Sequence, residues 1–277
     1  MLPQLANIYN PNKVYGHSQW LASPKLDGIR CLYYAPDKGL TSRSQKLRYV
    51  GFEEIEQICE LLRVNNNLSF MDGELYIPGE KFDIISGIVR KSRNYDINQK
   101  ARVEFRIFAV GSIDAPQMPA GLMLDLIRAL PETGRVNYLP YSVIPNTPTA
   151  IQTVAELVKS SGQSDEGIML RNPSSVYAGG RSNNLLKVKN FVKSTFVIVS
   201  FTKGTGKYAN SLGNLLVRGM VDGVVVMGKV GTGFSDAERS DIWTNQSNYL
   251  GKDIEVIYLG ITPAQKSLRH PVFSRFV

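Results

Sequence analysis

The sequence predicts an α+β protein of two domains, a larger mixed-sheet domain at residues 1–189 and a small β-barrel at residues 190–277. Up to residue 189, amphipathic helical patterns alternate with short extended runs. From residue 190 onward, short β-rich runs are separated by glycine turns and interrupted by one helical stretch. No Pro- or Gly-rich linker marks the boundary, so this change of pattern alone places it.

Hydrophobic periodicity predicts the elements of the larger domain. Strand-like runs on both sides of a turn at residues 36–39 predict a hairpin. Apolar residues at three- and four-residue steps predict a helix at 52–62, and Thr147-Pro148 and Gly162 mark the two ends of another. The remaining elements are a helix at 122–130 and extended runs, expected to join one mixed sheet, at 68–77, 104–110, 136–143, 165–171 and 185–189.

Four β-rich runs and one helix are predicted for the small domain. The runs lie at residues 196–201, 212–217, 224–226 and 254–259, and the helix at 236–244. Many short strands with glycine turns are typical of a small barrel.

Composition excludes several classes of protein. The chain has 277 residues, 43% of them hydrophobic and 20% charged, and it contains no apolar run of the roughly 18 residues that cross a bilayer. We therefore expect a soluble protein with no membrane partner. Its first residues lack the pattern of a secretory signal, which favours the cytoplasm, or the host cytoplasm for a viral chain. Cys31 and Cys59 lack a paired spacing, so we expect reduced, buried thiols.

A net charge of +8 favours a polyanionic partner, because lysine and arginine contacts to phosphates supply most non-specific affinity for nucleic acids. The basic segment at residues 90–102 has two interpretations, a solvated loop or a contact to such a partner.

The segment Ser23-Pro24-Lys25-Leu26-Asp27-Gly28-Ile29-Arg30 places a lysine at the end of an apolar run, directly before an Asp-Gly turn. Lysine is a poor nucleophile at its reference pKa of about 10.4, so chemistry on its nitrogen requires cationic neighbours or desolvation. Carboxylates inside the strand at 68–77 also need a compensating partner, and a bound cation would be one.

Other charged segments lie at the ends of predicted strands, and they supply what this lysine needs. They are Asp72-Gly73-Glu74-Leu75, Glu166-Gly167-Ile168-Met169-Leu170-Arg171 and Lys187-Val188-Lys189. Carboxylates can hold Mg²⁺, and clustered cations can hold a nucleoside triphosphate for attack on its α-phosphorus. Lys187 and Lys189 alternate with Val188, so their side chains are expected on one face of the strand.

The motif Lys-x-Asp-Gly-x-Arg, together with these segments in the same order, resembles the covalent nucleotidyltransferases and specifically the ATP-dependent DNA ligases. The resemblance covers nearly the whole chain. Its other matching segments are Ser42-Arg43, the aromatic strand around Phe108, Gly231-Thr232-Gly233-Phe234-Ser235-Asp236 and Leu268-Arg269-His270-Pro271-Val272-Phe273. It implies an ATP-grasp-like nucleotidyltransferase domain followed by an oligonucleotide-binding (OB) fold.

The resemblance also implies residue roles. Catalysis would fall to Lys25, which becomes adenylylated, with Asp27 and Arg30. ATP would be bound by Ser23, Pro24, Lys25, Arg30, Arg43, Glu74, Phe108, Lys187, Lys189 and Arg269, with Glu74 on the ribose and Phe108 stacked on the base, unless Phe108 is a core residue. Mg²⁺, for which Mn²⁺ can substitute, would be bound by Asp27, Glu74 and Glu166. Contacts to nicked duplex DNA would come from Arg43, Lys91, Arg93, Lys203, Lys207 and Phe234.

Two positions depart from the family's pattern. Ala109 stands where relatives often carry Asp after the aromatic residue, so any role of that acid is absent or moved. Ser23 stands where many relatives have Glu or Thr to read the adenine amino group, and a hydroxyl can accept the same hydrogen bond. The chain begins some twenty residues before Lys25, which leads us to expect the minimal viral or phage type, acting as a monomer.

The expected reaction is the sealing of a nick that carries a 3′-hydroxyl and a 5′-phosphate, through lysyl-AMP and DNA-adenylate, in replication, repair or recombination. RNA ligases and RNA capping guanylyltransferases use a related lysine motif and are the first alternative. The segment at residues 231–236 argues against both. A catalytically silent nucleic-acid-binding protein is the second alternative.

Overall fold

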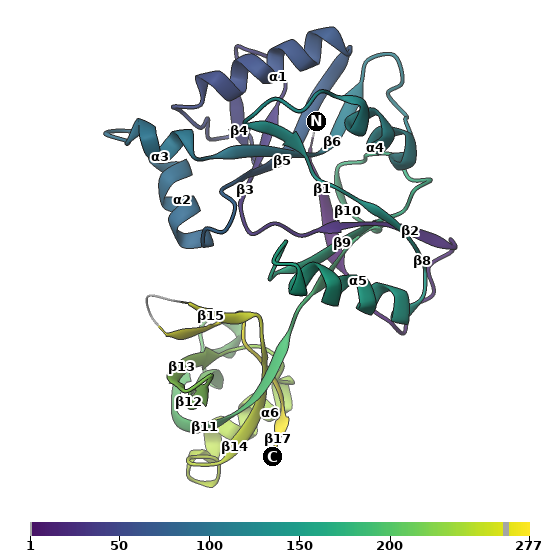
Figure 1. The fold of residues 1–277 in the computed structure, drawn as a ribbon. Helices are drawn as coiled ribbons and strands as arrows, with labels where there is room; N and C mark the ends of the chain where they lie inside the picture. Colours follow the sequence, from purple (N-terminus) through teal and green to yellow (C-terminus); the bar gives the residue numbers. More distant parts are fainter. Residues whose placement is uncertain (1, 263–265) are drawn as a thin grey trace. The chain divides into compact units, whose positions relative to one another are not determined.

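The structure is a computed structural model and describes residues 2–262 and 266–277. The chain divides into two compact units, residues 1–189 and 190–277 (Figure 1). Helices and strands are interspersed through the first unit, and strands dominate the second, so the predicted α+β class is confirmed.

The first unit contains two five-stranded sheets instead of the single mixed sheet that we expected. We call them the β5 sheet and the β9 sheet. The β5 sheet has the order β4 (Leu40–Ser42), β3 (Ile29–Tyr33), β5 (Leu68–Tyr76), β6 (Glu104–Ser112) and β7 (Val136–Tyr138). The β9 sheet has the order β1 (Gln4–Ile8), β10 (Gly180–Lys189), β9 (Gly167–Arg171), β2 (Gln19–Pro24) and β8 (Ser142–Pro145).

Both sheets are mixed, because β1 pairs in parallel with β10 and β7 pairs in parallel with β6. The single extended run predicted at 136–143 was wrong. Its first part is β7 in one sheet, and its last residues begin β8 in the other. A proline cannot donate to a strand ladder, and Pro140 lies between the two strands.

Each sheet has its own hydrophobic core. Helix α1 (Glu53–Asn65) buries Ile55, Cys59 and Leu62 in the core of the β5 sheet. Both cysteines are buried in this core as free thiols, as predicted. Helix α5 (Pro148–Ser160), capped by the Thr147 hydroxyl, packs on the β9 sheet (Figure 1). Helix α4 (Ala120–Ala129) adds to the β5 core.

In the first unit, sequence periodicity missed three short elements: β1, α2 (Phe82–Arg90) and α3 (Ile97–Ala101). In the second unit, it missed the strands Gly260–Thr262, Ser267–Arg269 and Val272–Phe276. Strand β1 has five residues, and α2 contains Ser86-Gly87, a pair with poor helix propensity. Helix α3 lies within the basic segment 90–102, so that segment is not wholly a loop.

The second unit is one curled seven-stranded sheet. Its order is β15 (Gly260–Thr262), β16 (Ser267–Arg269), β13 (Val224–Val230), β12 (Leu212–Val221), β11 (Val192–Lys203), β14 (Asp253–Tyr258) and β17 (Val272–Phe276). Helix α6 (Asp236–Thr244) begins at Ser235 with a capping box formed with Glu238. Short 3₁₀ turns lie at η1 (Gly206–Tyr208) and η2 (Gln246–Asn248). No pairing joins the outer strands β15 and β17 within the described residues, so the predicted barrel is an open half-barrel.

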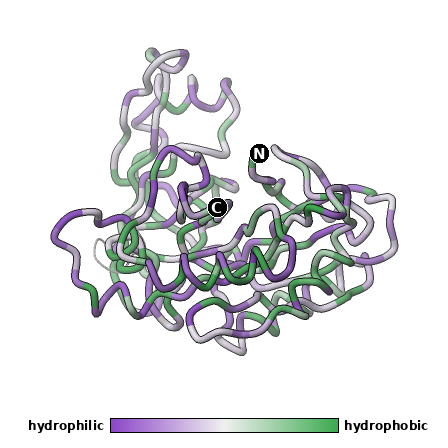
Figure 2. Tube along the Cα trace, turned by 90° about the horizontal axis from the view of Figure 1, so that it is seen from above, coloured by the Kyte–Doolittle hydropathy of each residue, from purple (hydrophilic) through white to green (hydrophobic). Residues whose placement is uncertain are grey.

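Figure 2 shows hydrophobic and hydrophilic residues interspersed along the trace. Within the described residues, every helix is too short or too polar to cross a membrane.

Gly167 begins β9 in a conformation that side chains rarely adopt, with φ of +112°. A Cβ atom there would lie 2.0 Å from the carbonyl oxygen of Val188, and the Gly167 carbonyl accepts the backbone N–H of Lys25 at 2.9 Å. We expect Gly167→Ala to lower the free energy of unfolding by roughly 2–4 kcal/mol. In urea denaturation, the control Gly87→Ala, at an exposed position of α2, should raise the free energy of unfolding by about 0.5–1 kcal/mol. Equal stability of the two variants would contradict this account.

Candidate active site

A cavity of about 280 Å³ lies between the two sheets of the first unit. Leu21, Ser23, Met169 and Lys187 line it from the β9 sheet, while Arg30, Glu74 and Phe108 line it from the β5 sheet. Of the residues predicted to bind ATP, it gathers Ser23, Pro24, Lys25, Arg30, Arg43, Glu74, Phe108 and Lys187.

Strand alternation explains which side chains face this cavity. Trp20 and Ala22 of β2 enter the core under α5, so Leu21 and Ser23 project from the opposite face. The chain then crosses to the β5 sheet through residues 25–28. Gly28 permits a close approach in this crossing, since a Cβ atom there would lie 2.6 Å from the Leu75 carbonyl oxygen.

The side chain of Lys25 forms an ion pair with Glu166, and both groups are partly accessible to solvent, Lys25 more than Glu166. The Ser164 hydroxyl donates to the Lys25 carbonyl oxygen and accepts the backbone N–H of Glu166 at 3.1 Å. Backbone and side chain of Lys25 are therefore both tied to the segment that precedes β9. The predicted neighbour Glu166 thus lies beside the predicted nucleophile.

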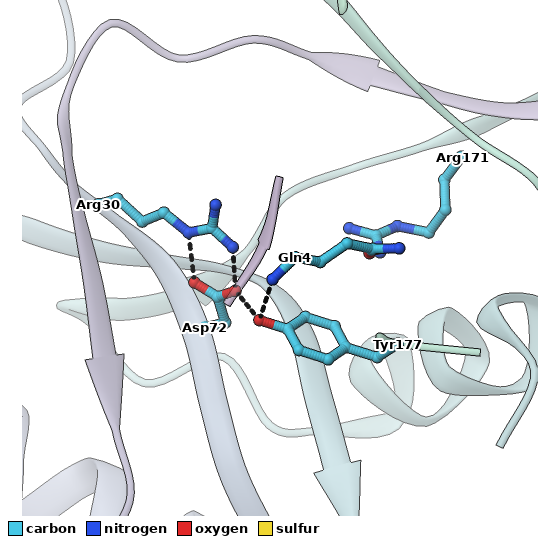
Figure 3. Close-up of polar contacts among 5 residues, drawn as sticks. All are labelled: Gln4, Arg30, Asp72, Arg171 and Tyr177. Atoms are coloured by element: carbon cyan, nitrogen blue, oxygen red, sulfur yellow. Dashed lines mark hydrogen bonds and ion pairs between the residues drawn. The ribbon is translucent and has the colours of Figure 1, made fainter. Parts of the chain in front are cut away.

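Arg30 and Asp72 form a second ion pair on the β5 sheet (Figure 3). Asp72 is fully buried, and its two oxygens accept Arg30 Nε at 3.0 Å and Nη2 at 2.5 Å. The Tyr177 hydroxyl donates to the same carboxylate at 2.6 Å. Although burial alone would lower the pKa of Arg30, the hydrogen bonds and charge of Asp72 raise it. Arg30 and Tyr177 thus compensate this buried carboxylate.

Glu74 is the second carboxylate of β5, and it lines the cavity. No hydrogen bond or ion pair joins its carboxylate to any residue within 2–262 and 266–277. Burial raises its pKa to about 8, an effect that the nearby Lys25 and Arg30 only partly oppose. Its oxygens are therefore available to a ligand in the cavity.

The remaining predicted ATP ligands differ in their placement. Phe108 is half-buried and lines the cavity, with the Arg30 guanidinium 5.4 Å from its ring centroid. Lys187 also lines it, and its pKa is lowered by desolvation and by the charges of Lys189, Arg181 and Lys25. Lys189 lies two residues further along β10, opposite Gly167 and outside the lining.

The three predicted metal ligands are not brought together. Among the residues that the structure describes, no group of three or more His, Cys, Asp and Glu side chains could hold a metal ion. Glu166 and Glu74 flank the cavity region around Lys25, whereas Asp27 lies in the turn outside the lining. Magnesium commonly binds through one or two carboxylates, with phosphates and water supplying the rest, so Glu166 and Glu74 still fit an ion that enters with a nucleotide.

The residues predicted to bind DNA lie on exposed or partly exposed surfaces. Arg43 lines the cavity, while Lys91 and Arg93 follow α2 as exposed residues. Lys203 and Lys207 are exposed on the second unit, where Lys207 lies 3.4 Å from Asp236. Phe234 stacks on Phe273 with ring centroids 4.5 Å apart, so at least one of its faces is used within the fold. Arg269 ends β16 of the same unit.

Sequence reasoning named Arg171 in a charged segment without giving it a role, and it missed Arg181, Tyr141 and the strand β1. Arg171 and Arg181 could have been found by counting in steps of two from Met169 and Lys187, because alternate residues of a strand share a face. Ala109 is fully buried in the β5 core, so the departure from the family's acid places no charge there.

Comparison with known proteins gives this geometry a family. The profile described as "ATP dependent DNA ligase domain" matches residues 3–189, and "DNA ligase OB-like domain" matches residues 203–276. The DNA ligase of Haemophilus influenzae is 24% identical over 267 residues, which cover 95% of this chain and 87% of that protein. DNA ligase 2 of Methanosarcina mazei is 26% identical over 240 residues, and the match spans 79% of this chain but 41% of that longer protein.

A solved structure of a Lig E DNA ligase, described as DNA binding with a minimal scaffold, has the same fold. It is 26% identical with a TM-score of 0.75, over 99% of this chain and 98% of that one. The family profile alone covers more than half of the sequence, so this chain belongs to the ATP-dependent DNA ligases.

Proposed function

We propose that this ligase seals nicks with a 3′-hydroxyl and a 5′-phosphate in duplex DNA, through an AMP group carried on Lys25. The observation that supports this most directly is the Lys25–Glu166 pair at a cavity lined by Arg30, Glu74, Phe108 and Lys187. The cavity offers an amine, cations for phosphates, an acceptor for hydroxyls and an aromatic face.

In the first step, the Lys25 nitrogen attacks the α-phosphorus of ATP and forms a P–N bond, while the bond to pyrophosphate breaks. Glu166 lies where it can accept the proton that the amine loses. Arg30, Lys187 and Lys189 neutralise charge on the α-phosphate, and Arg43 and Arg269 take further phosphate contacts. Bound Mg²⁺, held by Glu166 and Glu74, would supply further charge neutralisation.

The nucleoside is recognised by the remaining lining residues. Glu74 accepts hydrogen bonds from the ribose hydroxyls, and Phe108 stacks on the base opposite Met169 of the other sheet. Ser23 and Pro24 lie at the base edge, where the Ser23 hydroxyl can accept from the adenine amino group.

Two transfers to DNA follow. The 5′-phosphate of the nick displaces Lys25 and takes AMP, and the 3′-hydroxyl then displaces AMP to form the phosphodiester bond. Asp27 helps to place the attacking hydroxyl. Lys91, Arg93, Lys203 and Lys207 contact the duplex backbone, and Phe234 adds an apolar contact, with the protein acting as a monomer. Such contacts fix position on the duplex without reading its sequence.

Replacing Lys25 with Ala should abolish labelling of the protein by α-³²P-ATP, because no other amine replaces the nucleophile. The exposed Lys13→Ala variant serves as the control and should label normally. Full labelling of Lys25→Ala would overturn the proposal. The same assay with GTP, and joining assays on nicked DNA and nicked RNA, compare the nucleotide and strand preferences.

The raised pKa of Glu74 predicts how stability depends on pH without nucleotide. Glu74 keeps a proton in the folded state up to about pH 8, whereas in the unfolded chain it ionises near its ordinary pKa of 4.5. Folding therefore retains a proton between these values, and this group's contribution to the free energy of unfolding falls as pH rises from about 4.5 to 8. Glu74→Gln should remove this contribution in urea denaturation at about pH 5 and about pH 8. The exposed control Glu132→Gln should leave the pH dependence of the free energy of unfolding unchanged. The same pH dependence in the unmodified protein, Glu74→Gln and Glu132→Gln would refute the assignment.

The salt dependence of DNA binding tests the phosphate-binding lysines of the second unit. Removing one lysine that binds a phosphate should reduce the slope of log K against log salt concentration by about 0.9. Lys203→Ala and Lys207→Ala should each show this reduction in titrations of nicked duplex from low to moderate salt. Lys252→Ala, another exposed lysine of the same unit, should retain the original slope. If all three variants keep it, these two lysines do not contact phosphate.

A further inference from the structure

The hydroxyl of Tyr177 is bonded to both sheets that enclose the cavity. Tyr177 lies in the segment between β9 and β10. Its hydroxyl donates to Asp72 Oδ2 of the β5 sheet at 2.6 Å and accepts the backbone N–H of Gln4, in β1 of the β9 sheet, at 3.2 Å (Figure 3). A single oxygen atom thus links strands from opposite sides of the active site.

Polar groups continue this link beyond Gln4. The Gln4 side chain is 1% exposed, and its Oε1 accepts Arg171 Nη1 at 2.6 Å. Its Nε2 has no partner among the described residues. Burial lowers the pKa of Arg171 to about 10, and no carboxylate within the described residues forms an ion pair with it. Figure 3 shows Gln4 between Tyr177 and Arg171.

General energetics do not favour this set of residues as a source of stability. A buried donor without a partner is costly, and apolar side chains often replace buried ionic groups without loss of stability. A buried polar network can instead impose one specific geometry. Here the network can impose the geometry of Arg30, because Tyr177 and Arg30 both donate hydrogen bonds to the carboxylate of Asp72.

Asp72 holds Arg30 through Nε and Nη2, so the plane of the guanidinium follows the plane of the carboxylate. Nη1 makes no hydrogen bond to another residue within 2–262 and 266–277, and Arg30 lines the cavity. The direction in which Nη1 meets a phosphate therefore depends on the orientation of Asp72. Tyr177 is the further contact that fixes this orientation.

We propose that Tyr177 is a positioning residue that sets the phosphate-facing donor of Arg30 through Asp72, with the backbone of Gln4 as its anchor. The inference rests on the proposed AMP transfer to Lys25. Without the Tyr177 hydroxyl, the carboxylate of Asp72 can rotate and Arg30 can leave its productive direction. The proposed ATP-binding contacts of Glu74, Phe108 and Lys187 remain. Loss of the Tyr177 hydroxyl should therefore lower the rate of AMP transfer more than the affinity for ATP.

The test is single-turnover adenylylation of the full chain at varied ATP concentration. Tyr177→Phe keeps the ring contact with Phe70, whose centroid lies 4.7 Å away, and removes only the hydroxyl. We expect the maximal rate to fall about tenfold while half-saturating ATP changes by less than about twofold. Tyr33→Phe is the matched control, because this buried tyrosine also donates to a carboxylate, Glu60, at 3.0 Å, but lies outside the cavity lining.

The double variant of Tyr177→Phe with Asp72→Asn should be no slower than Asp72→Asn alone, since both changes act through one carboxylate. A lower melting temperature without a change in maximal rate would make Tyr177 merely structural and overturn the inference. Equal rate losses in Tyr177→Phe and Tyr33→Phe would overturn it as well. Failure of the unmodified protein to label would instead overturn the proposed function and this inference together.

Discussion

The chain passes from one sheet to the other within the four residues 25–28, and the active-site cavity depends on this short crossing. Lys25 is held at one end by the Gly167 carbonyl, and Gly28 is pressed against β5 at the other. Because β2 and β3 belong to different sheets, the crossing fixes the distance between the two walls of the cavity at Lys25. The Asp-Gly turn is therefore a constraint on the cavity as well as a local turn.

The two carboxylates of β5, Asp72 and Glu74, differ in whether the protein itself already binds them. Asp72 is fully buried and has both oxygens occupied, whereas Glu74, two residues further along the same face of β5, has a raised pKa and no partner among the described residues. The two carboxylates look equivalent in the sequence. Their surroundings differ: Asp72 is bonded to protein groups and helps to hold the site together, whereas the carboxylate of Glu74 remains open to a bound molecule.

Much of the larger domain could be predicted from periodicity, because long amphipathic patterns and the Thr147-Pro148 cap act locally. The division into two sheets could not, since it depends on which strands pair across more than a hundred residues, as β2 does with β8 and β9. The cavity residues carried by motif lysines and acids were predictable. The contact of Arg171 with Gln4 and the role of Tyr177 at Asp72 were not, because no local pattern encodes contacts between such distant segments.

The two ion pairs at the cavity differ in what a ligand can change. Arg30 and Asp72 form a bidentate pair whose carboxylate is sealed from water, so separating them would leave a buried charge without compensation. Lys25 and Glu166 form a partly accessible pair at the cavity, and phosphates or a metal ion can exchange for either partner there. In the proposed reaction, the first pair would therefore keep its geometry throughout, while the second would open for Lys25 to react.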